Sequence, residues 1–224
     1  MNQTSYDTFK DRLNDSFNLI GEEDYIRTSV MVPLVFKQGE YHLLFERRTG
    51  AISQGYEICF PGGRIDSSSG ESSLDAAIRE TAEEIGIDRG KVTPDLHLGV
   101  LVTNRNMTVD CHVCRLDIKG VEECVPNPAE VESVFTIPLS FFEETVPDRY
   151  EVVITVHPSV RDENGNDHVL LPSRELGLPS RYHSAWGNFR QPVYSYKTDY
   201  GVIWGITARI ILTLVRKIRD AEIS

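Results

Sequence analysis

Cysteine is scarce in this chain, with four among 224 residues. Cys59, Cys111, Cys114 and Cys124 are too few and too irregularly spaced for the disulfide framework of a small secreted domain. Cys111 and Cys114 form a C-x-x-C pair, but no second pair accompanies them to complete a zinc site of that type. We therefore expect reduced cysteines that serve in packing.

Long apolar runs are also missing. The N-terminus has no apolar run of signal-peptide length. The most apolar stretch, residues 201–215, is too short to cross a bilayer and contains Arg209. These absences argue against a membrane protein and predict a cytoplasmic location.

Positive charge is in short supply. The chain has 23 Lys and Arg against 34 Asp and Glu, which gives a net charge of −11. Such a balance disfavours nonspecific binding to nucleic acid or to anionic membranes, so we expect neither partner. A small phosphorylated substrate can still bind where arginines and a metal ion make the local charge positive.

What the chain does have is a segment, residues 79–87, in which glutamates recur at helical spacing. At about 100° per residue, Glu80, Glu83 and Glu84 share one side of a helix, and apolar residues share the other. A solvated helix face is the common alternative for such a cluster. We reject it because like charges at this spacing destabilise a helix, and Arg79 is the positive charge within this turn. Mg²⁺ or Mn²⁺, which prefer oxygen ligands, would neutralise the cluster.

Glycines stand on both sides of this segment. Pro61-Gly62-Gly63 precedes it, and glycine allows a close backbone approach, so the Gly63 carbonyl could reach the same cation. Gly86 stands where the C-terminal cap of the helix belongs.

These residues resemble the signature of the Nudix hydrolases, which reads Gly, five residues, Glu, seven residues, then Arg-Glu-aliphatic-x-Glu-Glu-x-Gly-aliphatic. Glu71 lies eight residues before Arg79, as that signature requires, and the residues up to Ile87 follow in register. Two features depart from it. Seven residues separate Gly63 from Glu71, and Thr81 holds a normally aliphatic position. We expect the two additional residues in the turn-forming loop tip ahead of the helix.

The resemblance implies hydrolysis of a pyrophosphate bond in a nucleoside diphosphate linked to another group. Water attacks phosphorus, and a metal ion neutralises charge on the phosphate oxygens. Arg79 would orient a glutamate through a salt bridge. A separate carboxylate would serve as the base, and we favour Glu130 over Glu132, although an exposed loop acid is an equal alternative for Glu130. The implied metal ligands are the Gly63 carbonyl, Glu80, Glu83 and Glu84.

The segments that flank the signature resemble the coenzyme A diphosphatase subgroup. Residues 43–63 begin with Leu-Leu-Phe-Glu-Arg and end with Phe-Pro-Gly-Gly, and residues 202–210 are similar to the subgroup's terminal helix. An arginine position of the subgroup falls on Ile52, and a glycine position falls on Tyr56. Coenzyme A or a derivative is the expected substrate. The candidate phosphate contacts are Arg47, Arg48 and Arg64, each of which could instead be a solvent-facing arginine.

Two other functions remain open. A hydrolase of ADP-ribose or another nucleotide sugar would use the same signature, with different residues around the active site to contact the substrate. A noncatalytic nucleotide-sensing module would keep the fold without turnover, but the intact Glu80, Glu83 and Glu84 argue against it.

The organisation along the chain is predicted as follows. Residues 1–26 form an amphipathic helical extension, with Tyr6, Phe9, Leu13 and Phe17 at helical spacing, that docks on the domain or on the partner of a homodimer. Residues 27–224 form the Nudix hydrolase domain, an α/β/α sandwich with a mixed sheet between helices, and the last helix covers the second sheet face. The strands are expected at residues 29–36, 41–47, 57–60, 98–103, 108–116 and 131–137.

An insertion is predicted around residues 157–192. The Asn-Gly turn at 164–165 predicts a hairpin between residues 151–156 and 168–171, followed by an irregular region from 171 to 192. Such an insertion could cap the active site or form a dimer contact. Its aromatic and imidazole side chains could stack on a purine or simply anchor the loop; they are Tyr182, His183, Trp186 and Phe189.

Overall fold

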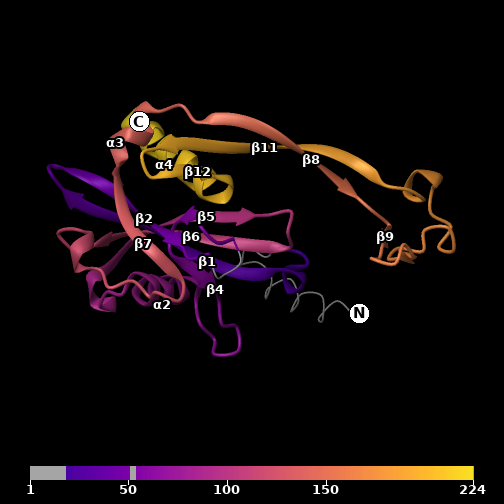
Figure 1. The fold of residues 1–224 in the computed structure, drawn as a ribbon, viewed down its shortest axis with the longest axis horizontal. Coiled ribbons are helices and arrows are strands. Elements are labelled where there is room, and N and C mark those ends of the chain that lie inside the picture. The colour runs from indigo at the N-terminus through magenta and orange to yellow at the C-terminus, as the bar shows by residue number, and fades with distance from the viewer. Residues whose placement is uncertain (1–18, 51–53, 224) are drawn as a thin grey trace, which may run out of the picture. The chain divides into compact units, whose positions relative to one another are not determined.

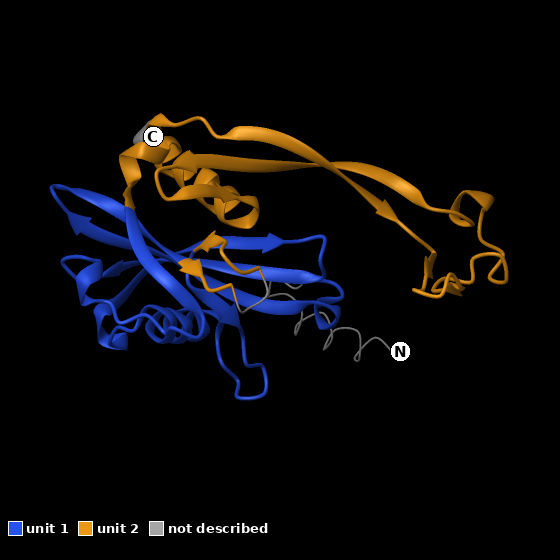
Figure 2. Cartoon of the chain, viewed as in Figure 1, with its two compact units in different colours: residues 1–46, 60–136 blue, residues 47–59, 137–224 orange. Residues whose placement is uncertain are grey.

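The computed structural model describes residues 19–50 and 54–223 (Figure 1). The chain divides into two compact units: residues 1–46 with 60–136, and residues 47–59 with 137–224 (Figure 2). Most of the helix predicted for residues 1–26 lies outside the described residues, as does Ile52. Within the described part of that segment, η1 (Glu22–Asp24) is a short 3-10 turn.

The first unit is built on a mixed sheet, as predicted. Its central strand order is β2-β1-β6-β5, with β4 paired to β1 and β7 paired to β2. β1 and β6 run parallel, whereas β1–β2, β1–β4 and β5–β6 are antiparallel. The strands are β1 (Ile26–Lys37), β2 (Glu40–Arg48), β4 (Gly62–Arg64), β5 (Val92–Val102), β6 (Met107–Leu116) and β7 (Val131–Pro138).

Helix α2 (Ser73–Ile85) packs against this sheet. It begins at Ser72, whose hydroxyl accepts a hydrogen bond from the Asp75 amide, and it ends at Gly86 in the left-handed conformation, so the predicted cap is confirmed. A short turn, η2 (Arg89–Lys91), leads into β5. The apolar side of α2 and the facing strands form a buried core that includes Met31, Val35, Leu44, Ala77, Ile85 and Cys114.

The second unit contains a separate three-stranded sheet of order β12-β11-β8. Its last helix, α4, packs on β11 and β12, and Tyr196 of β11 meets Phe142 of α3 edge to face. That α4 also covers the second face of the main sheet stays a prediction. The elements are β3 (Ile58–Cys59), α3 (Leu139–Glu144), β8 (Asp148–Val156), β11 (Trp186–Thr198), β12 (Gly201–Trp204) and α4 (Gly205–Ile223).

The predicted pairing of residues 151–156 with 168–171 is wrong. β8 pairs with β11 instead, from Trp186 to Ser195, and the Asn-Gly turn joins two much shorter strands, β9 (Ser159–Arg161) and β10 (Asp167–Val169). The region from 171 to 192 is also less irregular than predicted, because it holds η4 (Ser180–Tyr182) and the start of β11. The Asn-Gly signal correctly predicts a turn, but it does not determine which strand pairs with β8. The nine-residue β8 pairs with the longer β11, which lies much farther along the chain.

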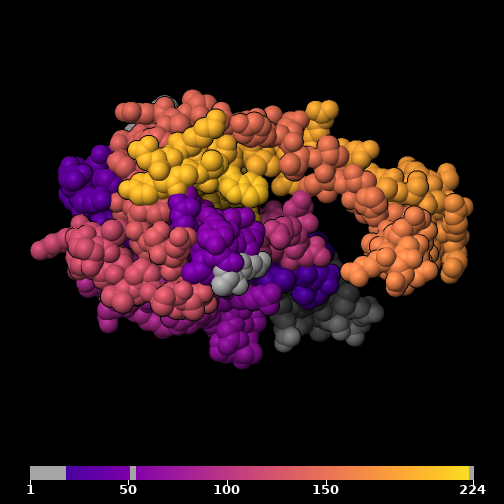
Figure 3. Space-filling view, viewed as in Figure 1, coloured from indigo at the N-terminus to yellow at the C-terminus, as the bar shows by residue number. Residues whose placement is uncertain are grey.

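In Figure 3 the insertion is drawn in orange; its residues 157–185 connect the paired ends of β8 and β11, and residues 186–192 belong to β11. Within the described residues, none of the helices has the length and hydropathy needed to cross a membrane.

Candidate active site

Glu84 occupies the most enclosed position among the glutamates of α2. Its side chain is buried, with 3% of the residue exposed. One carboxylate oxygen, Oε2, accepts a hydrogen bond from the Gly62 amide at 2.8 Å. The Pro-Gly-Gly turn and the acidic side of the helix are therefore in direct contact, as the sequence predicts.

Glu80 packs against the next glycine. A methyl group added at Gly63 would lie 2.3 Å from Oε1 of Glu80, so a side chain at this position would displace the carboxylate. Gly63 is held in β4 by its pairing with Ser29 of β1. The backbone of β4 and two carboxylates of α2 thus converge on one place.

Arg79 connects this cluster internally. Its Nε and Nη2 donate to Glu71 at 2.8 and 3.1 Å, and its Nη1 donates to Glu80 at 2.8 Å and to Glu83 at 3.3 Å. Nη2 also donates to the carbonyl of Arg64. The hydrogen bond to Glu71, followed by the one to Glu80, raises the pKa of Arg79, and the contact with Arg79 lowers the pKa of Glu71. The salt bridge expected for Arg79 is present, and its guanidinium is engaged by protein groups.

The longer loop leaves Glu71 in register with Arg79. Asp66 closes the loop through its Oδ1, which accepts from the amide and the hydroxyl of Ser68, and its own amide donates to Oε2 of Glu71 at 2.9 Å. Gly70 adopts a φ of 75° at the end of this turn. The additional residues therefore fold into a local turn ahead of the helix.

The unusual Thr81 is accommodated inside the helix. It is fully buried, and its hydroxyl donates to the Ala77 carbonyl at 2.6 Å. This contact with the residue four positions earlier satisfies the only polar group that distinguishes threonine from an aliphatic residue of similar size. The departure from the signature is thus a local substitution that leaves the helix intact.

The loop that carries Glu130 is attached to the end of α2. The Asn127 amide donates to the Glu84 carbonyl at 2.9 Å, and the Val125 amide donates to the Gly86 carbonyl at 3.3 Å. Glu130 itself is half-buried and accepts a hydrogen bond from Asn127 Nδ2 at 3.4 Å. Glu132, the alternative base, is exposed at the start of β7.

The donor set fits a hard divalent cation. All of its candidate ligands are oxygens, and Glu71, Glu80 and Glu83 form ion pairs with Arg79 or Arg89. The contact between Gly63 and Glu80 also leaves no room for a side chain beside the candidate carbonyl ligand. Mg²⁺ and Mn²⁺ match such oxygen ligands.

The three candidate phosphate contacts differ in their surroundings. Arg64 is exposed at the end of β4, next to Arg79. In the second unit, Arg47 donates to the carbonyls of Tyr56 and Tyr200 and so helps to hold this part of the backbone. Arg48 Nε, also in that unit, is buried without a hydrogen-bond partner among the described residues.

The side chains proposed to stack on a purine contact one another or nearby backbone. Tyr182 meets Trp186 edge to face at 5.3 Å, with Arg181 over the Tyr182 ring, and His183 Nε2 lies 3.0 Å from the Leu178 carbonyl. Phe189 is 60% exposed. These contacts agree with anchoring of the loop, and purine stacking stays a prediction.

The C-x-x-C pair packs as expected. Cys111 and Cys114 are both buried, and because they lie three residues apart on β6 they point to opposite faces of the sheet. Burial raises the pKa of each thiol to about 12. The two thiols therefore cannot bind the same ion.

The sequence analysis missed a cluster of His97, Asp110 and His112 beside this pair. The Asp-x-His pattern at residues 110–112, on a predicted strand, could have pointed to it.

Comparison with known proteins gives consistent matches. A family model described as NUDIX domain matches residues 26–156. Nudix hydrolase 3 of Caenorhabditis elegans is 37% identical over 117 residues, which are 50% of this chain and 47% of the relative. Peroxisomal coenzyme A diphosphatase NUDT7 of Mus musculus is 34% identical over 115 residues, 51% of this chain and 48% of the relative. The chain thus spans about half the length of these two relatives.

A bacterial relative is matched over most of its length. The protein named Uncharacterized Nudix hydrolase NudL, from Photorhabdus laumondii, is 29% identical over 191 residues, which are 85% of this chain and 84% of the relative.

Proposed function

Because this chain belongs to the Nudix hydrolase family and is an enzyme of that family, we propose that coenzyme A or a derivative is the diphosphate substrate that it hydrolyses. The observation that carries the catalytic part of the proposal is the contact between the buried Glu84 carboxylate and the Gly62 amide. It brings the acidic side of α2 against the backbone of β4, which supports a shared metal site for the two elements.

The proposed roles follow from the contacts of each residue. Glu80, Glu83, Glu84 and the Gly63 carbonyl hold Mg²⁺ or Mn²⁺, which when bound would neutralise phosphate charge and acidify a water molecule. Arg79 orients Glu80 and Glu83, and Glu71 in turn orients Arg79. A ligand fixed in this way loses less conformational freedom when it binds the ion.

Glu130 is the proposed general base. It stands on a loop that is hydrogen bonded to the end of α2, so its position is coupled to that of Glu84 through Asn127. It is half-buried and can still exchange protons with solvent.

The choice of coenzyme A has two supports. The segments at residues 43–63 and 202–210 resemble the coenzyme A diphosphatase subgroup, and the mouse relative carries that activity in its name. Arg64 is the proposed phosphate contact closest in the chain to the cluster, and Arg47 and Arg48 are the candidates in the second unit. ADP-ribose or a nucleotide sugar is the alternative substrate, and a noncatalytic sensor is the alternative class.

The test is a side-by-side assay of coenzyme A and ADP-ribose with added Mg²⁺ or Mn²⁺, read by the masses of the products. We expect coenzyme A to be split at its pyrophosphate bond into a pantetheine monophosphate and an adenosine bisphosphate, and ADP-ribose to be a poorer substrate. Faster cleavage of ADP-ribose would reject the choice of substrate, and equal inactivity on a wider panel of nucleoside diphosphates would favour the sensor.

A second measurement tests the site itself. Glu84→Gln keeps an oxygen that can accept from the Gly62 amide, so the chain should fold, whereas turnover should fall by about a hundredfold or more. Glu144→Gln removes an exposed glutamate of α3 that has no proposed role and is the matched control. Equal turnover by wild type and Glu84→Gln would contradict the proposed site.

A homodimer and a cytoplasmic location stay predictions. Sedimentation would decide the first, and imaging of the tagged protein in its own cells would decide the second. The mouse relative is named a peroxisomal enzyme.

A further inference from the structure

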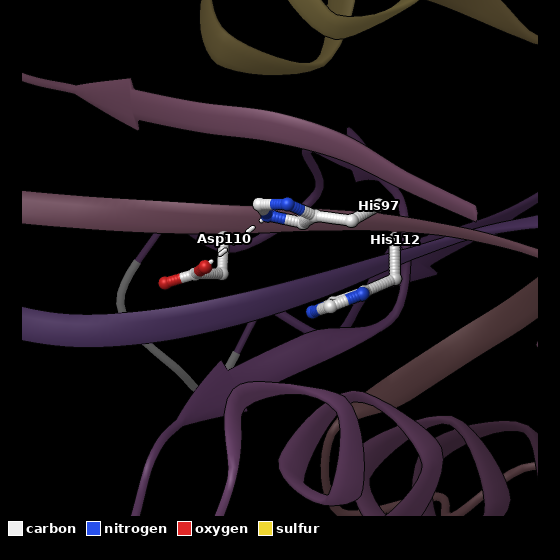
Figure 4. Close-up of side chains that lie close together, drawn as sticks. All are labelled: His97, Asp110 and His112. Atoms are coloured by element: carbon white, nitrogen blue, oxygen red, sulfur yellow. Dashed lines mark ion pairs between the residues drawn. The ribbon is translucent and has the colours of Figure 1, made fainter. Parts of the chain in front are cut away.

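Three side chains with metal-binding groups meet on β5 and β6, outside the acidic cluster of α2. They are His97, Asp110 and His112, and one ligand atom from each lies within 4.8 Å of the other two (Figure 4). Among the described residues, this is the one group of three or more His, Cys, Asp or Glu with that geometry. Two imidazoles and one carboxylate form a different donor set from the all-oxygen cluster around Glu84.

The strand register explains the meeting. His97 is paired directly with His112, so both rings stand on one face of the sheet, and Asp110 shares that face because it lies two residues from His112. The register shifts between His97 and Gly99, which has a φ of 142°. This irregularity re-aims the strand so that His97 Nε2 lies 3.3 Å from Asp110 Oδ1.

The distances suit a small tetrahedral ion. Zinc binds nitrogen and carboxylate oxygen at about 2.0–2.2 Å, which separates neighbouring donors by roughly 3.3–3.5 Å in a tetrahedron. The His97–Asp110 distance already has that value. The His97 side chain is 48% exposed and can turn toward an ion. The ring of His112 is buried and lies 3.1 Å from the Ser73 hydroxyl, so it is already held in place.

The surroundings of the cluster also favour binding. The contact with Ser73 is of the kind that orients metal-bound imidazoles in proteins. Asp110, with its side chain 16% exposed, supplies a negative charge beside both rings.

We propose that His97, Asp110 and His112 form a second metal site, which binds a transition-metal ion of the Zn²⁺ class with one coordination position open to solvent. Imidazole ligands select such ions over Mg²⁺. The site joins β5 to β6, and through Ser73 it contacts the first residue of α2. It shares no ligand with the acidic cluster, so its existence does not depend on the proposed function.

The test is a zinc titration of the full chain by calorimetry, with Mg²⁺ in large excess to occupy the acidic cluster. Wild type should bind one Zn²⁺, and His97→Ala and Asp110→Asn should each weaken that binding at least tenfold. His157→Ala removes an exposed histidine outside the cluster and should leave the affinity unchanged. Glu84→Gln should also retain it.

A spectroscopic measurement identifies the ligands directly. Zinc should shift the ring ¹⁵N resonances of His97 and His112 in wild type while leaving His157 unmoved. The proposal would be overturned by equal zinc affinity in wild type and His97→Ala, or by ring resonances of the cluster that do not shift when zinc is added. The cluster would then be only an ion pair beside a buried histidine.

Discussion

Arg79 donates two hydrogen bonds to Glu71, from Nε at 2.8 Å and from Nη2 at 3.1 Å, although the loop that leads from Gly63 to Glu71 is two residues longer than in the Nudix signature. The same guanidinium reaches Glu80 and Glu83. Glu71 is therefore linked to the proposed metal ligands through one arginine, and the length of the loop does not break that link.

Glu71→Gln should weaken metal binding without removing a ligand. A neutral amide cannot make the same charge-assisted pair with Arg79, so the guanidinium loses its fixed position and the orientation of Glu80 with it. We expect the Mn²⁺ affinity of the acidic cluster to fall about 10–100-fold, as measured by calorimetry. An unchanged affinity would show that Arg79 keeps its place without Glu71.

The same variant predicts a pH dependence of stability. The pKa of Glu71 in the folded chain is lowered from its ordinary 4.5, chiefly by Arg79, so its contribution is complete above the unfolded-state pKa. It is lost as the pH falls through the lowered folded-state pKa. The difference in free energy of unfolding between wild type and Glu71→Gln should therefore be constant near neutral pH and shrink in acid. A difference that grows in acid would contradict this sign.

Alanine at the adjacent Gly62 and Gly63 should change the stability of the fold by very different amounts. At Gly62 the new methyl group would lie 2.4 Å from the Ser29 carbonyl oxygen and 2.8 Å from Val30 Cα, both backbone atoms, so the fold should lose at least about 2 kcal/mol. At Gly63 it would meet the end of the flexible Glu80 side chain. Stability should then change by less than about 1 kcal/mol.

Metal affinity completes that comparison. Gly63→Ala displaces a proposed ligand, so Mn²⁺ binding should weaken even though the melting temperature hardly moves. A Gly63→Ala variant that binds Mn²⁺ as wild type does would remove Glu80 from the proposed ligand set.

The buried thiols should resist modification in the folded chain. Cys111 and Cys114 have pKa values raised to about 12 by burial, so the thiolate is almost absent at pH 8. A colorimetric thiol reagent should label them only after denaturation, and Cys111→Ser and Cys114→Ser should each lower the denatured count by one. Rapid labelling of either residue in the native protein would contradict the packing role.

Helix α2 was predictable from the sequence because the signals that define it are local. Glu80, Glu83 and Glu84 fall on one face by periodicity alone, and Gly86 ends the helix where its conformational freedom is needed. The pairing of β8 with β11 was not predictable, since its register joins residues that lie 30 (Val156 and Trp186) to 47 (Asp148 and Ser195) positions apart, and the Asn-Gly signal between them belongs to a smaller hairpin. His97 and Asp110 were missed for the same reason, because only the pairing of β5 with β6 brings them together.

Gly86 and Gly70 provide a matched test of how the end of α2 is fixed. Both have positive φ, 65° and 75°, so alanine should cost about 1–2 kcal/mol at either position from backbone strain alone. At Gly70 nothing lies within 4 Å of the added methyl group, whereas at Gly86 it would lie 1.7 Å from the Val125 carbonyl oxygen. Gly86→Ala should therefore destabilise the chain by about 3 kcal/mol or more in chemical denaturation.

The clash at Gly86 also has a functional consequence. Val125 and Asn127 connect the end of the helix to the loop of Glu130, so moving that loop aside should displace the proposed base. Turnover of Gly86→Ala, measured where the variant is still folded, should fall more than its metal affinity does, and Gly70→Ala should keep both. If the two variants lose equal stability, strain alone explains the glycine at position 86, and the contact with Val125 does not constrain the loop.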